Sequence, residues 1–198
     1  MSAVIKQALF SPDEYLAMER QAECKSEYHE GQIFAMTGAS RGHNLIVWNI
    51  GSELGRQLKS HPCEAYISDM RVKPATASNY FYPDVSVVCD QPAFEDTYTD
   101  TLLNPTVLME VLSPSTEAYD RGAKFSHYRK IPSLKEYWLV AQDKPLIERF
   151  VRQSSDWVLT VFEGIEAVAA SEAIGCSLAL REVYDKVTFP AEPDLAEP

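Results

Sequence analysis

The chain has 198 residues, of which 45% are hydrophobic and 24% are charged. This composition excludes disordered, collagen-like and coiled-coil classes and indicates one globular domain over residues 1–190, whose core needs no disulfide or structural metal. With 18 basic and 29 acidic residues, the formal charge of −11 argues against a protein that coats nucleic acid through bulk electrostatics.

The first third of the chain predicts a helix, a strand pair and a longer helix. Ser11 can cap a helix over residues 12–24, because Pro12 follows it and Glu14 stands at the capping-box distance. Residues 27–38 alternate in polarity around a Glu-Gly pair, which predicts two strands and a tight turn. The next helix is expected over 43–59, because apolar residues recur every four positions. These residues are Ile46, Ile50, Leu54 and Leu58.

The middle of the chain predicts three consecutive strands, a helix and a further strand. Segments 64–73, 82–90 and 106–113 are short and rich in Val, Ile, Tyr and Met, which favours strands. Residues 115–131 have helix-compatible spacing, and the apolar segment 135–140 fits the interior of a sheet.

The last part of the chain predicts a hairpin and a tail. Segments 146–151 and 157–162 flank a turn-forming QSSD and predict a β-hairpin. The acidic, proline-rich tail 191–198 is expected to be disordered. The element order predicts an α/β fold with a mixed central sheet flanked by helices and an additional C-terminal hairpin.

Membrane and cysteine patterns point to a cytoplasmic protein. No segment approaches the roughly 20 apolar residues of a membrane span, and the N-terminus has no secretory apolar block. The four cysteines have neither zinc-site spacing nor the density of a disulfide framework, so we interpret them as buried reduced thiols. They are Cys24, Cys63, Cys89 and Cys176.

Two carboxylates lie in predicted strands of the sheet. Glu110 is the single charged residue of an apolar segment, where an unpaired carboxylate costs several kcal/mol or takes up a proton. Asp84 follows Pro83 at the start of another apolar strand. A salt bridge or strand end would also explain Glu110, and a Pro-Asp pair is common in turns. Adjacent carboxylates repel unless a divalent cation separates them, so we expect both to bind Mg²⁺.

Lys124 lies on the helix that follows the Glu110 strand. Asp120, Lys124 and Tyr128 are spaced by four residues and form one stripe. The stripe can be a solvated ion pair with an extended lysine stem. In a functional interpretation, Lys124 lies near a metal-bound water or a scissile phosphate.

Three further residues are supporting candidates. His43 begins a helix after glycines, where unpaired N–H groups favour anions, although a histidine at a helix start is more often a cap or a packed residue. Asp69 shares a predicted strand face with Arg71, so an ion pair between them accounts for it. Glu27 is expected to be exposed.

Charge is segregated along the chain. Residues 91–119 carry acids with no Lys or Arg, whereas 121–135 carry bases with no acid. We expect the basic segment, and within it Arg121, Arg129 and Lys130, to contact a nucleic-acid backbone.

Seven segments occur in an order that resembles a known family. They are SEYHEGQIFAM, SRGHN, SDMRV, YPDVSVV, LMEVLSPST, DRGAKFSHYRK and KEYWLV. Together, over residues 10–190, they resemble the Uma-type restriction endonuclease family, formerly a domain of unknown function, in the PD-(D/E)XK nuclease superfamily. The resemblance implies a restriction-endonuclease-like fold and phosphodiester hydrolysis.

The resemblance also implies site residues. Asp84 matches the metal-binding Asp, and Glu110 matches the acidic residue of the (D/E)XK element. Leu112 stands where that signature has lysine, and Lys124 matches a lysine displaced onto the next helix. Glu27 and His43 match recurrent positions without a defined role.

We therefore expect a DNA endonuclease that uses Mg²⁺, with Mn²⁺ as substitute. Asp84 and Glu110 would hold the metal, and Lys124 would orient the attacking water or stabilise the developing charge. Its partners would be DNA and a second copy in a homodimer, with no membrane. The alternatives are a noncatalytic interaction module that keeps the nuclease fold and a hydrolase of small phosphoesters.

Overall fold

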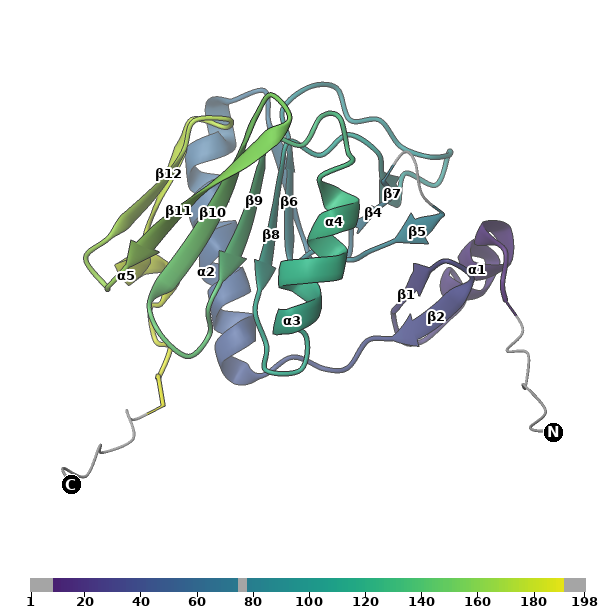
Figure 1. Ribbon diagram of the computed structural model, residues 1–198, viewed down its shortest axis with the longest axis horizontal. Coiled ribbons are helices and arrows are strands. Elements are labelled where there is room, and N and C mark those ends of the chain that lie inside the picture. The colour runs from purple at the N-terminus through teal and green to yellow at the C-terminus, as the bar shows by residue number, and fades with distance from the viewer. Residues whose placement is uncertain (1–8, 75–77, 191–198) are drawn as a thin grey trace.

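The computed structural model describes residues 9–74 and 78–190 (Figure 1). The predicted tail 191–198 lies outside the described residues. The centre is a six-stranded mixed sheet in the order β11-β10-β9-β8-β6-β3, in which β8 and β9 are parallel and all other neighbours are antiparallel. Its strands are β3 (Glu64–Ile67), β6 (Val85–Val88), β8 (Val107–Val111), β9 (Glu136–Val140), β10 (Leu146–Gln153) and β11 (Asp156–Glu163).

Helices cover both faces of this sheet, as predicted (Figure 1). On one face lies α2 (Arg41–Gln57), whose Ile46, Ile50 and Leu54 are fully buried against the sheet. The predicted four-residue spacing thus marks the buried side of α2, and a short 3₁₀ turn, η1 (Leu58–Ser60), ends it. The central strands are buried along their whole length, because apolar side chains of β6, β8 and β9 pack on both sides.

The opposite face is covered by one helical segment that contains a π-helical turn. It consists of α3 (Glu117–Tyr119), η2 (Asp120–Lys124) and α4 (Phe125–Tyr128), and η2 is the π-helix. Such turns are rare and frequently occur at functional sites. The predicted helix over 115–131 is confirmed, and its irregular turn carries Lys124.

Two N-terminal strands and one later strand form a small sheet beside this helical segment. It has the order β2-β1-β5, with β1 (Ser26–His29), β2 (Gln32–Ala35) and β5 (Asn79–Tyr80). The turn lies at Glu30 and Gly31, with φ of 48° and 92°, which is the left-handed pair that suits a two-residue hairpin. At Gly31 an added Cβ would also lie 2.9 Å from the Leu9 side chain.

The first helix is shorter than predicted. α1 (Pro12–Glu19) has the expected capping box, in which Ser11 and Glu14 bond to each other's backbone. The helix ends before Cys24, because the Glu19 carboxylate accepts the N–H of Ser26 and draws the chain back into β1.

Several short elements differ from the sequence prediction, because the strand expected over 64–73 divides into β3 and a separate strand over 71–72, and the other elements were not expected. The hairpin of β10 and β11 is confirmed, but a second hairpin and a final helix follow it, and two short strands pair in parallel beside the main sheet. They are β12 (Val168–Ser171), β13 (Cys176–Ala179), α5 (Leu180–Val183), β4 (Arg71–Val72) and β7 (Thr101–Leu102). None of the helices in the described residues has the length and hydropathy needed to span a bilayer.

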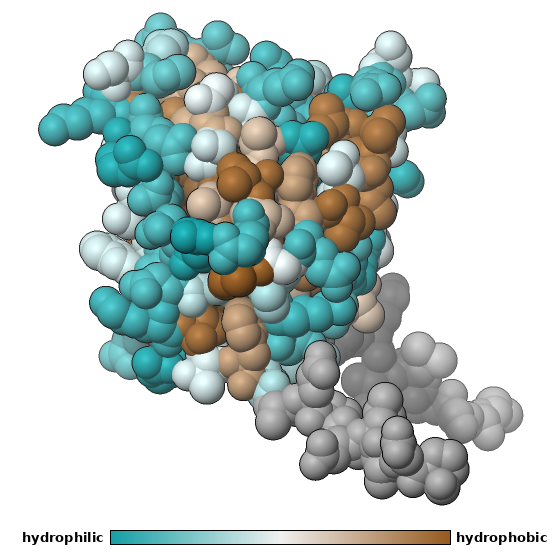
Figure 2. All heavy atoms as spheres, turned by 90° about the vertical axis from the view of Figure 1, so that its left-hand side faces the viewer, coloured by the Kyte–Doolittle hydropathy of each residue, from teal (hydrophilic) through white to brown (hydrophobic). Residues whose placement is uncertain are grey.

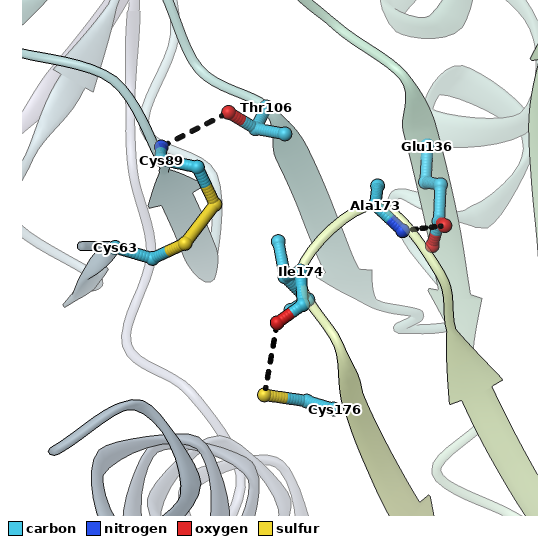
Figure 3. Close-up of a disulfide and its surroundings, with 7 residues drawn as sticks. All are labelled: Cys63, Cys89, Thr106, Glu136, Ala173, Ile174 and Cys176. Carbon is cyan, nitrogen blue, oxygen red and sulfur yellow. Dashed lines mark hydrogen bonds between the residues drawn. A yellow bond between two sulfur atoms is a disulfide. The ribbon is translucent and has the colours of Figure 1, made fainter. Parts of the chain in front are cut away.

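The expectation of four buried reduced thiols holds for Cys176 and is wrong for the other three cysteines. Cys63 and Cys89 form a disulfide across β3 and β6, although 26 residues separate them in the chain (Figure 3). The register pairs Glu64 with Val88, so the two cysteines lie opposite each other at the next position. Cys24 is an exposed thiol, and Cys176 is a buried one whose Sγ lies 3.5 Å from the carbonyl of Ile174.

The edge of the main sheet exposes apolar side chains. Figure 2 shows this side of the molecule, where hydrophobic residues alternate with hydrophilic ones. The exposed large apolar residues of β11, the following turn and β12 are Val158, Leu159, Val161, Ile165 and Val168.

Candidate active site

The sheet brings the two predicted carboxylates to one place. β6 and β8 are antiparallel with Val85 opposite Met109, so continuing the register by one residue sets Asp84 opposite Glu110. Opposite residues of paired strands point to the same face, here the face covered by α3, η2 and α4. Asp84 Oδ2 also accepts the backbone N–H of Val111 at 2.7 Å, which holds this carboxylate at the end of β8.

Lys124 reaches the same point from the helical segment. Its Nζ lies 2.9 Å from Glu110 Oε1, 3.1 Å from Glu27 Oε1 and 3.7 Å from Asp120 Oδ1. The Tyr128 hydroxyl donates to Glu110 Oε1 at 3.0 Å. The stripe of Asp120, Lys124 and Tyr128 is therefore buried against the sheet and is no solvated surface feature.

Glu27 belongs to this cluster, and its predicted exposure is wrong. Only 13% of its side chain is exposed. Its Oε1 accepts the backbone N–H of Tyr82 at 3.0 Å and contacts Lys124. No local pattern reveals this, because β1 reaches the cluster only when the small sheet packs on the helical segment.

His43 contacts the other oxygen of Asp84. Its Nε2 lies 2.9 Å from Asp84 Oδ1, and both side chains are largely buried. The Ser40 hydroxyl caps α2 by accepting the N–H of His43 at 3.0 Å, which sets the histidine in the first turn of the helix. The helix start thus positions a side chain on the carboxylate.

Asp69 lies outside the cluster, and its predicted ion pair with Arg71 is wrong. Its side chain is 85% exposed and contacts Lys25 at 2.8 Å, whereas Arg71 pairs with Asp100. The strand ends at Ile67 and Ser68 has a positive φ of 58°, so the alternation that would place Asp69 beside Arg71 is interrupted.

The predicted basic segment is partly neutralised. Arg121 forms ion pairs with Glu117 at 2.8 Å and with Glu148. Arg129 and Lys130 are exposed, and neither forms an ion pair with any described residue. Leu112, which stands where the superfamily signature has lysine, is buried in the same apolar cluster as Tyr128.

Burial and charge set the ionisation of the cluster. Burial raises the pKa of Glu110 well above its usual range, opposed by Lys124 and reinforced by Asp120, Asp84 and Glu27. Burial likewise raises the pKa of Asp120. Burial alone would lower the pKa of Lys124, but Glu110, Tyr128, Glu27 and Asp120 together raise it, so the side chain is an ammonium.

The donor set suits a hard cation. The carboxylates of Glu27, Glu110 and Asp120 contact the Lys124 ammonium, and Asp84, which contacts His43, lies opposite Glu110. Full ionisation of these four carboxylates therefore gives more negative charge than the one ammonium compensates. Oxygen donors in excess of positive charge fit Mg²⁺, which is held by one or two carboxylates and retains several waters. Within residues 9–74 and 78–190, no three His, Cys, Asp or Glu side chains converge as a complete ligand set. Lys124 lies between two of the carboxylates.

Comparisons with known proteins agree with this architecture. Residues 12–181 match the model of the Uma2 family, described as "Putative restriction endonuclease". Two proteins of Synechocystis sp. (strain PCC 6803), both described as uncharacterized, are 36% identical to the chain. One alignment covers 84% of this chain and 95% of the relative, and the other covers 90% and 93%.

A solved structure has the same fold. The crystal structure described as a putative nuclease belonging to DUF820, from Anabaena variabilis ATCC 29413, has a TM-score of 0.74 and 20% sequence identity. The match covers 90% of this chain and 99% of that chain. The expected restriction-endonuclease-like fold is confirmed, and the chain belongs to the Uma2 family of restriction-endonuclease-like proteins.

Proposed function

We propose that the chain is a metal-dependent DNA endonuclease whose centre is formed by Asp84, Glu110 and Lys124. The observation that carries this proposal is the meeting of two sheet carboxylates with one buried lysine of the next helix. Membership of the family supports a nuclease-like activity. The DNA substrate, the metal and the roles of the residues are our inference.

Asp84 and Glu110 would hold Mg²⁺, or Mn²⁺ in its place, through their carboxylate oxygens. When bound, the ion lowers the pKa of a coordinated water and neutralises charge on the phosphate. Tyr128 donates to Glu110, and His43 and the Val111 N–H contact the two oxygens of Asp84, so both carboxylates are held before substrate binds.

Lys124 supplies the positive charge of the centre. It remains an ammonium, so it acts by donating hydrogen bonds and stabilising negative charge, and it takes no proton from water. Glu27 and Asp120 hold its Nζ beside Glu110, which compensates for the absence of a lysine at Leu112.

The exposed Arg129 and Lys130 follow directly after the helical segment, and we expect them to contact the phosphate backbone. The described residues of one chain form one such centre. Cutting both strands of a duplex therefore requires a homodimer or two separate events.

A cleavage assay tests the proposal. Purified protein would be incubated with duplex, single-stranded and branched DNA in Mg²⁺, in Mn²⁺ and in EDTA. Asp84→Asn and Glu110→Gln should each reduce cleavage by at least about 10²-fold, the scale expected for losing a group that stabilises developing charge. The matched control is Asp69→Asn, which removes an exposed carboxylate outside the cluster.

The outcomes separate the alternatives. Cleavage that persists in EDTA or in Glu110→Gln contradicts the proposal. Hydrolysis of bis-p-nitrophenyl phosphate with no cleavage of any DNA would indicate a small-phosphoester hydrolase, which the charge of −11 suits. Absence of both activities, with metal bound or not, would indicate a noncatalytic module.

A further inference from the structure

A second polar contact joins β1 to the helical segment, beside the contact of Glu27 with Lys124. Glu27 and His29 are two residues apart on β1 and share a face, and Lys124 and His127 are three apart and share a helix face. Lys124 Nζ lies 3.1 Å from Glu27 Oε1, and His127 Nε2 lies 3.0 Å from His29 Nε2. The two contacts are therefore neighbours and join the same strand to the same helical segment.

Asn79 determines which ring nitrogens carry protons. Its Oδ1 accepts the N–H of Glu30 at 3.0 Å, so its Nδ2 is the group that lies 3.0 Å from His127 Nδ1. An amide NH₂ group only donates, so His127 Nδ1 must be an unprotonated acceptor. The proton of His127 is then on Nε2 and is donated to His29 Nε2, which leaves His29 with its proton on Nδ1.

A metal ion between the two rings does not fit this chain of hydrogen bonds. A neutral histidine that binds metal through Nε2 keeps a proton on Nδ1 and donates it to a carbonyl or carboxylate. Asn79 presents a donor to that nitrogen of His127. The described residues also contain no third histidine, cysteine or carboxylate that completes a ligand set.

Protonation of either histidine, in contrast, breaks this series of hydrogen bonds at a defined position. A second proton on His127 would place its Nδ1–H against the NH₂ of Asn79, and a second proton on His29 would place its Nε2–H against that of His127. Either event sets two donors face to face. The closed arrangement therefore exists only while both rings are neutral.

The surroundings favour the neutral form of His127. Burial lowers the pKa of His127, His29 and Lys130 act in the same direction, and Glu30 opposes them. His127 also lines an open cavity of about 520 Å³, together with Glu30 and Lys130, so water reaches the ring and can deliver protons.

We propose that Asn79, His127 and His29 form an acid-sensitive latch that holds β1 on the helical segment and thereby positions Glu27 on Lys124. The latch is closed when both rings are neutral and opens when either takes up a proton. A catalytic consequence of opening rests on the proposed nuclease function, but the latch itself does not.

The direction of the pH dependence follows from linkage. A histidine whose pKa is lower in the folded than in the unfolded state makes the unfolded chain bind more protons as pH falls, so stability decreases with acidification. The latch contributes its full stabilisation of the fold at pH values above the ordinary histidine pKa of about 6.5. This stabilisation is lost as pH falls through the pKa of folded His127.

Imidazole ¹⁵N NMR of the full chain tests the latch directly. At pH 8, His127 should show the Nε2–H tautomer and His29 the Nδ1–H tautomer, and His127 should titrate below about 6.5. Asn79→Asp keeps an acceptor for the Glu30 N–H and sets a carboxylate against His127 Nδ1. This variant should raise the titration midpoint of His127 by about one pH unit or more.

Hydrogen exchange supplies a second readout, and two results overturn the proposal. Protection of the β1 amides, corrected for intrinsic rates, should fall on acidification in the wild type and persist in Asn79→Asp. An Nδ1–H tautomer of His127 at pH 8, or wild-type β1 protection that does not fall as His127 titrates, refutes the latch. These wild-type measurements decide the question even if the variant fails to fold.

The control and the activity measurement separate this proposal from the proposed function. His61→Gln changes an exposed histidine outside the latch and should leave the His127 titration unchanged. If cleavage occurs, kcat of the wild type should fall with acid across the His127 titration relative to Asn79→Asp. If no cleavage occurs, the nuclease proposal fails while the NMR and exchange results still decide the latch.

Discussion

Replacing Lys124 with methionine should destabilise the protein strongly at neutral pH. Methionine keeps most of the stem but removes the ammonium that contacts Glu110 and Glu27, with Asp120 at 3.7 Å. The ammonium and Glu110 are almost completely buried, and removing one partner of a buried pair costs about 3 to 5 kcal/mol. At about 2 to 4 °C per kcal/mol for a chain of this size, we expect Tm to fall by about 6 to 20 °C.

The loss should depend on pH in a defined direction. Burial raises the pKa of Glu110 and of Asp120, and Lys124→Met removes the ammonium, which is the largest influence that lowers both pKa values. A carboxylate whose folded pKa is raised contributes its stability below its unfolded pKa and loses it as pH rises through the folded value. The Tm of Lys124→Met should therefore be closer to that of the wild type at pH 5 than at pH 8.

Thermal unfolding at both pH values measures this effect. Lys144→Met, which changes an exposed lysine, is the matched control. Adding Glu110→Gln to Lys124→Met removes one uncompensated charge and should recover part of the lost Tm at pH 8. If Lys124→Met unfolds with the Tm of the control, or if its loss is equal at pH 5 and pH 8, the reasoning about a buried ion pair is refuted.

Three further predictions concern DNA, the disulfide and a helix cap. Neutralising Arg129 and Lys130 should flatten the salt dependence of DNA affinity by about one log-log unit per lost phosphate contact, and an unaltered slope would show that they only face solvent. Replacing both Cys63 and Cys89 with alanine should lower the unfolding free energy by about 3 kcal/mol for a closed loop of this length, measured in denaturant, and no change would contradict a formed disulfide. Ser11→Ala removes the capping box of α1 and should cost about 1 kcal/mol, with Ser155→Ala in an exposed turn as control.

Much of the candidate site was accessible from local sequence. An isolated carboxylate in an apolar strand already indicates an unusual environment, and Glu110 is indeed buried with its pKa raised. The four-residue spacing of Asp120, Lys124 and Tyr128 correctly predicts a shared face. Whether that face meets water or a carboxylate depends on how the segment packs on the sheet, and the spacing is the same in both cases.

Local interactions therefore determined the elements of this protein. Three of these local features are the apolar spacing of α2, the capping box of α1 and the left-handed pair at Glu30 and Gly31. Each involves residues that are close together in the chain, so it can be predicted from the sequence. The same holds for the central strands, whose uninterrupted apolar character is typical of burial on both faces.

Contacts between distant residues were decided only by the tertiary structure. His29 and His127 are 98 positions apart, and Glu27 reaches Lys124 from a separate small sheet. Cys63 meets Cys89 because strand register sets them opposite, while a single left-handed residue, Ser68, turns Asp69 away from Arg71. Register and packing arise from the summed burial of many side chains, so no short segment encodes which distant carboxylate, thiol or imidazole a given residue will meet.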